Sequence, residues 1–236
     1  MIMKMSMLKK IAVCASAGVM FASFSATIAS AANDDYAKFN SSSYAAYTDS
    51  LTKADKAAIA AKEAQSVKLG AQKAAYGNAV TMNTLPGFTV YQSTVSDPVA
   101  ACIYNTLMYV VKKSPSQATI SNTVKKDFAK IPAYVNARAS KCHYVVTQPK
   151  SAANLANYIN YDINTAKIPT FLRLTNLNAA NWYYVVGSTS LLAVGISSDK
   201  SLIRIADPFV RRVAGCPNVY MKSASVVYQH VTHVCW

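Results

Sequence analysis

Four short apolar segments after residue 163 constrain the fold of this chain more than any other feature. Separated by turn residues, they are IPTFLRL (168–174), NWYYVV (181–186), SLLAVGI (190–196) and SLIRIAD (201–207). Valine, isoleucine, leucine and tyrosine dominate these segments, and this composition is typical of β-strands. We therefore expect the C-terminal half of the chain to form an antiparallel meander.

Helical patterns come before these strands. The expected helix starts are Asp97 followed by Pro98, the capping-box pattern at 114–117, and Ser151. The apolar residues that follow at helical spacing are Val99, Ile103, Leu107, Val110 and Val111, then Ile120, Val124 and Phe128, then Leu155, Ile159 and Ile163. Helices followed by strands indicate an α+β domain over residues 88–236, with N-terminal helices packed on a C-terminal antiparallel sheet.

Two further strands are expected among the helices. FTVYQSTV (88–95) alternates between apolar and polar residues, and CHYVVT (142–147) is rich in β-forming residues. Before them, 78–87 ends in Leu-Pro-Gly and has the composition of a linker.

Residues 1–31 have the layout of a secretory signal peptide. Lys4, Lys9 and Lys10 precede an apolar run of about a dozen residues, and Ala29 and Ala31 frame a small-residue cleavage site. The run is shorter than the roughly 20 residues that span a bilayer, so no transmembrane segment is expected. The sequence thus predicts a secreted or periplasmic protein after removal of residues 1–31.

Residues 32–87 are expected to form an alanine-rich helical arm and a linker. Alanine, lysine and glutamate favour a helix there, and Thr48 or Asp49 is the expected cap. Large apolar residues are few, so the arm can bury only a thin stripe. It is interpreted as a spacer or a pro-segment.

The chain is strongly basic. Loss of the three lysines of the signal peptide lowers the formal net charge from +14 to +11. A basic exported protein is suited to anionic cell-surface polymers, although the charge also serves solubility. The lysines form no dense run, and no specific binding of nucleic acid is expected.

Four cysteines follow the signal peptide, and in an exported protein an even number favours disulfides. Cys216 and Cys235 are the preferred pair, and a bridge between Cys102 and Cys142 is the structural alternative to a reactive thiol. Zinc coordination by the two C-terminal cysteines with His230 and His233 is a weaker alternative. No metal or cofactor is predicted.

The order of motifs resembles that of bacteriocin-processing, double-glycine-type cysteine peptidases of the papain-like superfamily. The resemblance covers roughly residues 88–210, and AVGISSDKSLIRIADPF (193–209) is its most specific part. It implies a papain-like fold in which Cys102 matches the nucleophile and Asp207 the group that orients a histidine. Gln92 is the candidate for a glutamine that stabilises the oxyanion, although it lies farther from Cys102 than is usual.

The chemistry of such a site is well defined. A thiol near a helix N-terminus forms a thiolate more readily, an imidazole accepts its proton, and a carboxylate orients the imidazole. The matching histidine position falls at Thr189 or, in another register, at Tyr183, and neither supplies an imidazole. His143 is the one substitute base that the sequence offers.

Three hypotheses follow. The first is an exported, degenerate peptidase-like protein that binds a peptide or protein ligand without cleaving it. The second is an active envelope or secreted cysteine peptidase or amidase that uses Cys102, His143 and Asp207. The third is a cationic, disulfide-stapled protein that binds an anionic surface polymer.

Overall fold

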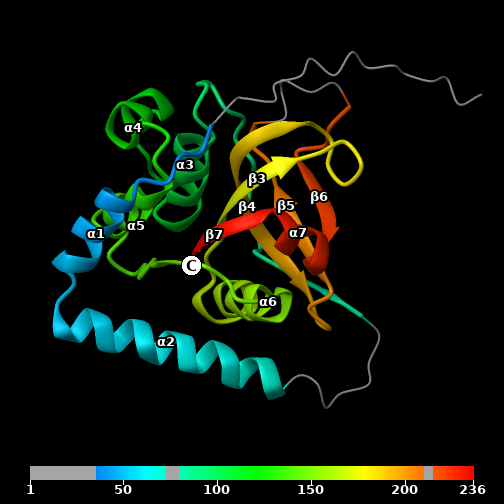
Figure 1. Cartoon of the computed structure of the whole chain (residues 1–236), viewed down its shortest axis with the longest axis horizontal. Helices are drawn as coiled ribbons and strands as arrows, with labels where there is room; N and C mark the ends of the chain where they lie inside the picture. Colours follow the sequence, from blue (N-terminus) through cyan, green and yellow to red (C-terminus); the bar gives the residue numbers. More distant parts are fainter. Residues whose placement is uncertain (1–35, 73–79, 210–214) are drawn as a thin grey trace, which may run out of the picture.

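The computed structural model describes residues 36–72, 80–209 and 215–236, and these residues form an α+β fold (Figure 1). Its seven α-helices are α1 (Ser41–Ser50), α2 (Lys53–Gln72), α3 (Pro98–Val110), α4 (Gln117–Val124), α5 (Ile131–Asn136), α6 (Ala152–Tyr161) and α7 (Ala224–His230). Two other helical turns are η2 (Phe128–Lys130) and the π-helical η3 (Asp162–Ala166). Its strands are β1 (Met82–Thr84), β2 (Val146–Thr147), β3 (Thr170–Leu177), β4 (Val186–Ser197), β5 (Leu202–Ala206), β6 (Val219–Ser223) and β7 (Val231–Cys235).

All seven strands belong to one antiparallel sheet. The order is β2-β7-β3-β4-β5-β6. Strand β1 pairs with the C-terminal part of β4, which extends past Thr170, the first residue of β3. Gly195 allows this close approach, because a Cβ there would lie 2.8 Å from the carbonyl oxygen of Asn83 on β1. The glycine of the AVGI segment is therefore required by strand packing. The predicted α+β class and antiparallel sheet are confirmed.

The predicted helix starts at Asp97 and Ser151 are confirmed, and α4 starts within the predicted range 114–117, although the predicted capping box does not form because the Gln117 side chain bonds to the segment 92–94. Asp97 caps α3 and Pro98 occupies the first turn; Ser116 caps α4, and Ser151 caps α6. Asp97 does more than cap, because its second carboxylate oxygen accepts hydrogen bonds from Ser121 Oγ (2.8 Å) and from the Lys126 backbone N–H (3.1 Å). This buried carboxylate ties the start of α3 to the end of α4.

The prediction of a strand at 88–95 is wrong. This segment is a loop, and several of its backbone groups bond to helix side chains instead of to a neighbouring strand. Asn105 on α3 accepts from the N–H of Tyr91 and donates to its C=O, at 2.7 and 2.9 Å. Gln117 on α4 accepts from the Thr94 N–H and donates to the C=O of Gln92. The strand lies in the predicted linker, as β1.

The segment 181–186 is not a strand either, except at its last residue, where β4 begins. Asn178 holds the start of this segment in a turn, because its oxygens accept hydrogen bonds from the N–H groups of Ala180, Asn181 and Trp182. The strand predicted at 142–147 is confined to β2.

The predicted arm contains two helices with a break at Leu51. Thr48 and Asp49 lie inside α1, which Asn40 caps, so the expected caps are wrong. Thr52 and Asp55 exchange hydrogen bonds between side chain and backbone at the start of α2. Helix α2 then lies along α6 (Figure 1).

The predicted signal peptide and residues 73–79 lie outside the described residues. Within 36–72, 80–209 and 215–236, no helix combines the length and the apolar character that are needed to cross a bilayer.

Candidate functional site

Cys102 lies in the second turn of α3 and faces β4. Its side chain is fully buried, and its Sγ donates a hydrogen bond to the carbonyl oxygen of Ser190, 3.3 Å away. Burial raises the pKa of this thiol well above its ordinary value, and the nearby Asp207 carboxylate acts in the same direction. A nucleophilic cysteine needs an accessible thiolate. In this structure, Cys102 is an enclosed thiol whose raised pKa disfavours the thiolate.

Asp207 follows β5 and is also fully buried. One of its carboxylate oxygens accepts hydrogen bonds from the hydroxyls of Tyr184 (2.7 Å) and Tyr220 (3.1 Å), and the other accepts from the N–H of Phe209 (2.9 Å). Burial raises the pKa of Asp207 to about 6, although these hydrogen bonds lower it. Two phenols therefore lie beside this carboxylate, at the position where the peptidase resemblance implies an imidazole.

The segment that carries Gln92 lies next to Asp207. The N–H of Ser93 donates a 2.6 Å hydrogen bond to the C=O of Pro208. Both polar atoms of the Gln92 amide group, together with the hydroxyls of Thr189 and Ser190, are buried without a hydrogen-bond partner among the described residues. Buried polar atoms are normally paired, so such a group marks a place where water or a ligand can bind.

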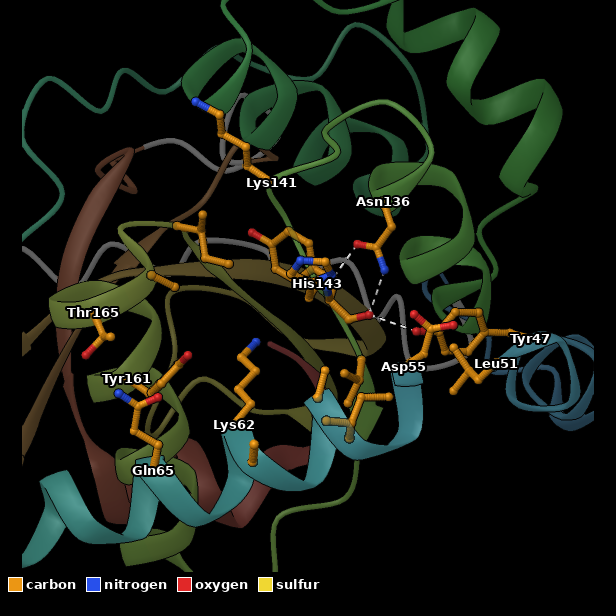
Figure 2. Close-up of a pocket in the computed structure, with 17 residues that line it drawn as sticks. Tyr47, Leu51, Asp55, Lys62, Gln65, Asn136, Lys141, His143, Tyr161 and Thr165 are labelled. Atoms are coloured by element: carbon orange, nitrogen blue, oxygen red, sulfur yellow. Dashed lines mark hydrogen bonds between the residues drawn. The ribbon is translucent and has the colours of Figure 1, made fainter. Parts of the chain in front are cut away.

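His143 lies elsewhere. It is exposed in the loop before β2 and lines a cavity of about 490 Å³ whose other walls come from α1, α2, α5 and the end of α6 (Figure 2). Among the described residues, no contact joins His143 to Cys102 or Asp207. The structure therefore brings Cys102, Asp207 and the Gln92 segment to one region and leaves the proposed base outside it.

Lys62, which also lines this cavity, forms an ion pair with the buried Asp162. Lys62 of α2 places its Nζ 3.4 Å from a carboxylate oxygen of Asp162 and 4.5 Å from the centre of the Trp236 ring. Burial raises the pKa of Asp162 to about 6, and Lys62 opposes this rise. The ion pair attaches the arm to the rest of the fold.

The other histidines have structural surroundings. His230 Nδ1 lies 3.2 Å from the C=O of Thr175, and the ring of His233 stacks on Phe39 at 4.0 Å. Burial, with a smaller contribution from Arg173, lowers the pKa of His233 to about 4. No group of three or more metal-binding side chains occurs in the described part of the chain. The zinc alternative therefore has no support.

The four cysteines after the signal peptide are all unpaired in this structure. Cys216 precedes β6 and Cys235 ends β7, and these strands stand four positions apart in the sheet, roughly 19 Å at the usual strand spacing. A disulfide requires Cα atoms within about 7 Å. The preferred pair is therefore not formed, and neither is the bridge between Cys102 and Cys142, because Cys102 faces β4.

No sequence pattern distinguishes Tyr184 and Tyr220 from the other tyrosines of the C-terminal half. Only their common contact with Asp207 sets them apart. Comparison of the chain with protein-family models, with curated proteins and with solved structures gave no match.

Proposed function

We propose that this chain is an exported protein with a papain-like, peptidase-like domain that binds a peptide or protein ligand without cleaving it. One observation carries this proposal: Asp207 receives its hydrogen bonds from Tyr184, Tyr220 and the backbone, while Cys102 is enclosed and has no imidazole beside it. A cysteine peptidase needs a base that accepts the thiol proton. Binding is the activity that such a site can still perform.

The arrangement of the elements supports the peptidase likeness. Helix α3 carries Cys102 against β4, and Asp207 directly follows the adjacent strand β5. The Gln92 segment reaches the same place through its hydrogen bond to Pro208. This places the candidate nucleophile, oxyanion residue and carboxylate around one region, without the base.

An active-site thiol probe tests the proposal. The native chain is treated with a reactive cysteine-peptidase inhibitor that carries a reporter group, and the labelled residue is identified by mass spectrometry. We expect no label on Cys102 until the chain is unfolded in denaturant, and none at any stage in a Cys102→Ser control. Stoichiometric labelling of native Cys102 that an unlabelled inhibitor blocks would contradict the proposal.

A second function, binding to an anionic surface polymer, has one specific observation in its favour. Within residues 80–209 and 215–236, the buried carboxylates are Asp97, Asp127, Asp162 and Asp207. Asp199 is the one exposed side-chain carboxylate in these ranges, so nearly all exposed charged side chains there are positively charged. Retention on a heparin matrix should fall steeply between about 0.05 M and about 0.5 M salt. Retention that does not depend on salt would remove this electrostatic argument.

A further inference from the structure

Residues 36–40, with a bend at Ala37, run between the sheet and the turn after α4 (Figure 1, dark blue, leading into α1). On the sheet side, the N–H of Tyr36 donates to the C=O of Ser188 (3.2 Å), and the N–H of Ala37 donates to Ser188 Oγ (3.1 Å). The C=O of Ala37 accepts from Arg173 Nε at 2.7 Å. Strands β3 and β4 thus bind the main chain of this segment.

The helical side binds the next main-chain groups. The N–H of Lys38 donates to the C=O of Lys126, and the C=O of Lys38 accepts from the N–H of Phe128, both at 2.8 Å. The N–H of Asn40 donates to a carboxylate oxygen of Asp127 at 3.0 Å. The segment forms a parallel β-bridge with this turn. The sheet and the turn after α4 are thus the two walls of a groove, and both walls bind the backbone of residues 36–40.

The side chains of the segment face different surroundings. Ala37 is fully buried, whereas Lys38 is exposed. The ring of Phe39 stacks on His233, and the ring of Tyr36 packs against Phe209 with centroids 5.3 Å apart. The groove therefore selects a small residue between two aromatic residues and leaves one position open.

We infer that this groove is a binding site for a peptide with the pattern aromatic–alanine–any–aromatic, bent at the alanine, and that residues 36–39 occupy it as a resident ligand. Hydrogen bonds to main-chain groups do not depend on the side chains of the peptide, while the enclosed position of the alanine supplies selectivity. The inference rests on the proposed binding function. The two sites are contiguous, because Ser188 lies two residues before Ser190, which accepts the hydrogen bond of Cys102.

A resident segment in the same chain has a high effective concentration, so a free peptide competes poorly until the segment is displaced. The full chain and its Ala37→Trp variant are titrated with a fluorescent peptide of the sequence of residues 34–40. Tryptophan exceeds the enclosed space at position 37, so the variant should release its own segment and bind the peptide at least about tenfold more tightly than the wild type.

Matched controls isolate the groove. Lys38→Trp places the same side chain at the neighbouring exposed position and should leave peptide binding as weak as in the wild type. A peptide with tryptophan in place of alanine should bind none of the chains. Equal binding of the parent peptide to all three chains, or to none, would overturn the inference.

A measurement on the wild-type chain keeps the test independent of the folding of any variant. Excess parent peptide should accelerate amide hydrogen exchange in residues 36–40, while the tryptophan-containing peptide should not. Unchanged exchange with both peptides would also overturn the inference. Cleavage of the bound peptide would contradict the non-catalytic function and still support the groove, whereas absence of binding with Cys102 unlabelled would contradict the groove alone.

Discussion

The hydroxyl of Tyr184 lies 2.7 Å from a carboxylate oxygen of Asp207 and donates a hydrogen bond to it, across 23 positions of sequence. Tyr220 donates to the same oxygen. Together these two hydrogen bonds give the buried carboxylate two phenolic donors, so its hydrogen bonding is satisfied without an imidazole. It also makes Asp207 a structural residue whose removal from water is offset by neighbours.

Tyr184→Phe should therefore destabilise the fold. The substitution leaves a buried carboxylate with one donor fewer, which typically costs about 1–3 kcal/mol in the free energy of unfolding. Urea denaturation measures the loss. The matched control is Tyr183→Phe on the neighbouring, largely exposed ring, which should change the free energy by no more than about 0.5 kcal/mol. Equal losses in the two variants would show that the hydrogen bond to Asp207 has no special value.

Asp207→Asn should change the pH dependence of stability. Burial raises the pKa of Asp207 to about 6 in the folded chain, above the ordinary value of about 3.9. The folded state therefore binds a proton between these pH values that the unfolded state lacks. This contribution is fully present below about pH 4 and is lost as the pH rises through about 6.

The free energy of unfolding of the wild type minus that of the variant should increase as the pH falls from 6 to 4, by up to about 1.4 kcal/mol per pH unit. His233 has a lowered pKa and acts in the opposite direction, but it is common to both proteins and cancels. Denaturation at a series of pH values provides the measurement. A difference that does not vary with pH would mean that Asp207 does not titrate in this range.

Lys62→Met should detach α2 and destabilise the chain. It leaves Asp162 as an uncompensated buried charge, and breaking a buried pair in this way typically costs about 3–5 kcal/mol. The double variant Lys62→Met with Asp162→Asn should recover part of the loss, as a double-mutant cycle would show. Thermal unfolding and limited proteolysis within α2 are the measurements. Lys68→Met, an exposed control on the same helix, should have no comparable effect.

Cys216 should be the first of the four cysteines that follow residue 31 to react with iodoacetamide. It is partly exposed, whereas Cys102, Cys142 and Cys235 are buried. Burial still raises the pKa of Cys216 to about 12, so its labelling should accelerate as the pH rises. Peptide mapping of the native chain identifies the site. Rapid labelling of any buried thiol at neutral pH would contradict this order of reactivity.

The starts of α3 and α6 and the strands β3, β4 and β5 could be predicted from the sequence because their causes are local, whereas β1 and β6 were not predicted as strands. Asp97 and Ser151 cap helices through hydrogen bonds to N–H groups three residues away, and the apolar segments of β3, β4 and β5 need only their own composition. The sequence also shows that Tyr183 and Thr189, the two positions that match the histidine of the peptidases, carry no imidazole. The residue type at a position is known without any knowledge of its spatial neighbours.

Local patterns failed where distant residues supply the partners. Asn105 and Gln117 bind the backbone of 88–95, so a segment with strand-like alternation forms no strand. β7 lies between β2 and β3, which separates Cys235 from Cys216.

By itself the sequence determined the α+β class, the starts of α3 and α6, and the absence of a histidine at positions 183 and 189. Only the tertiary structure decided that the thiol is enclosed, that phenols bind Asp207, and that Ala37 is buried against Ser188, 151 positions away. The reason is physical: caps and periodicity act within a few residues, whereas burial and long-range hydrogen bonds depend on how the whole chain packs.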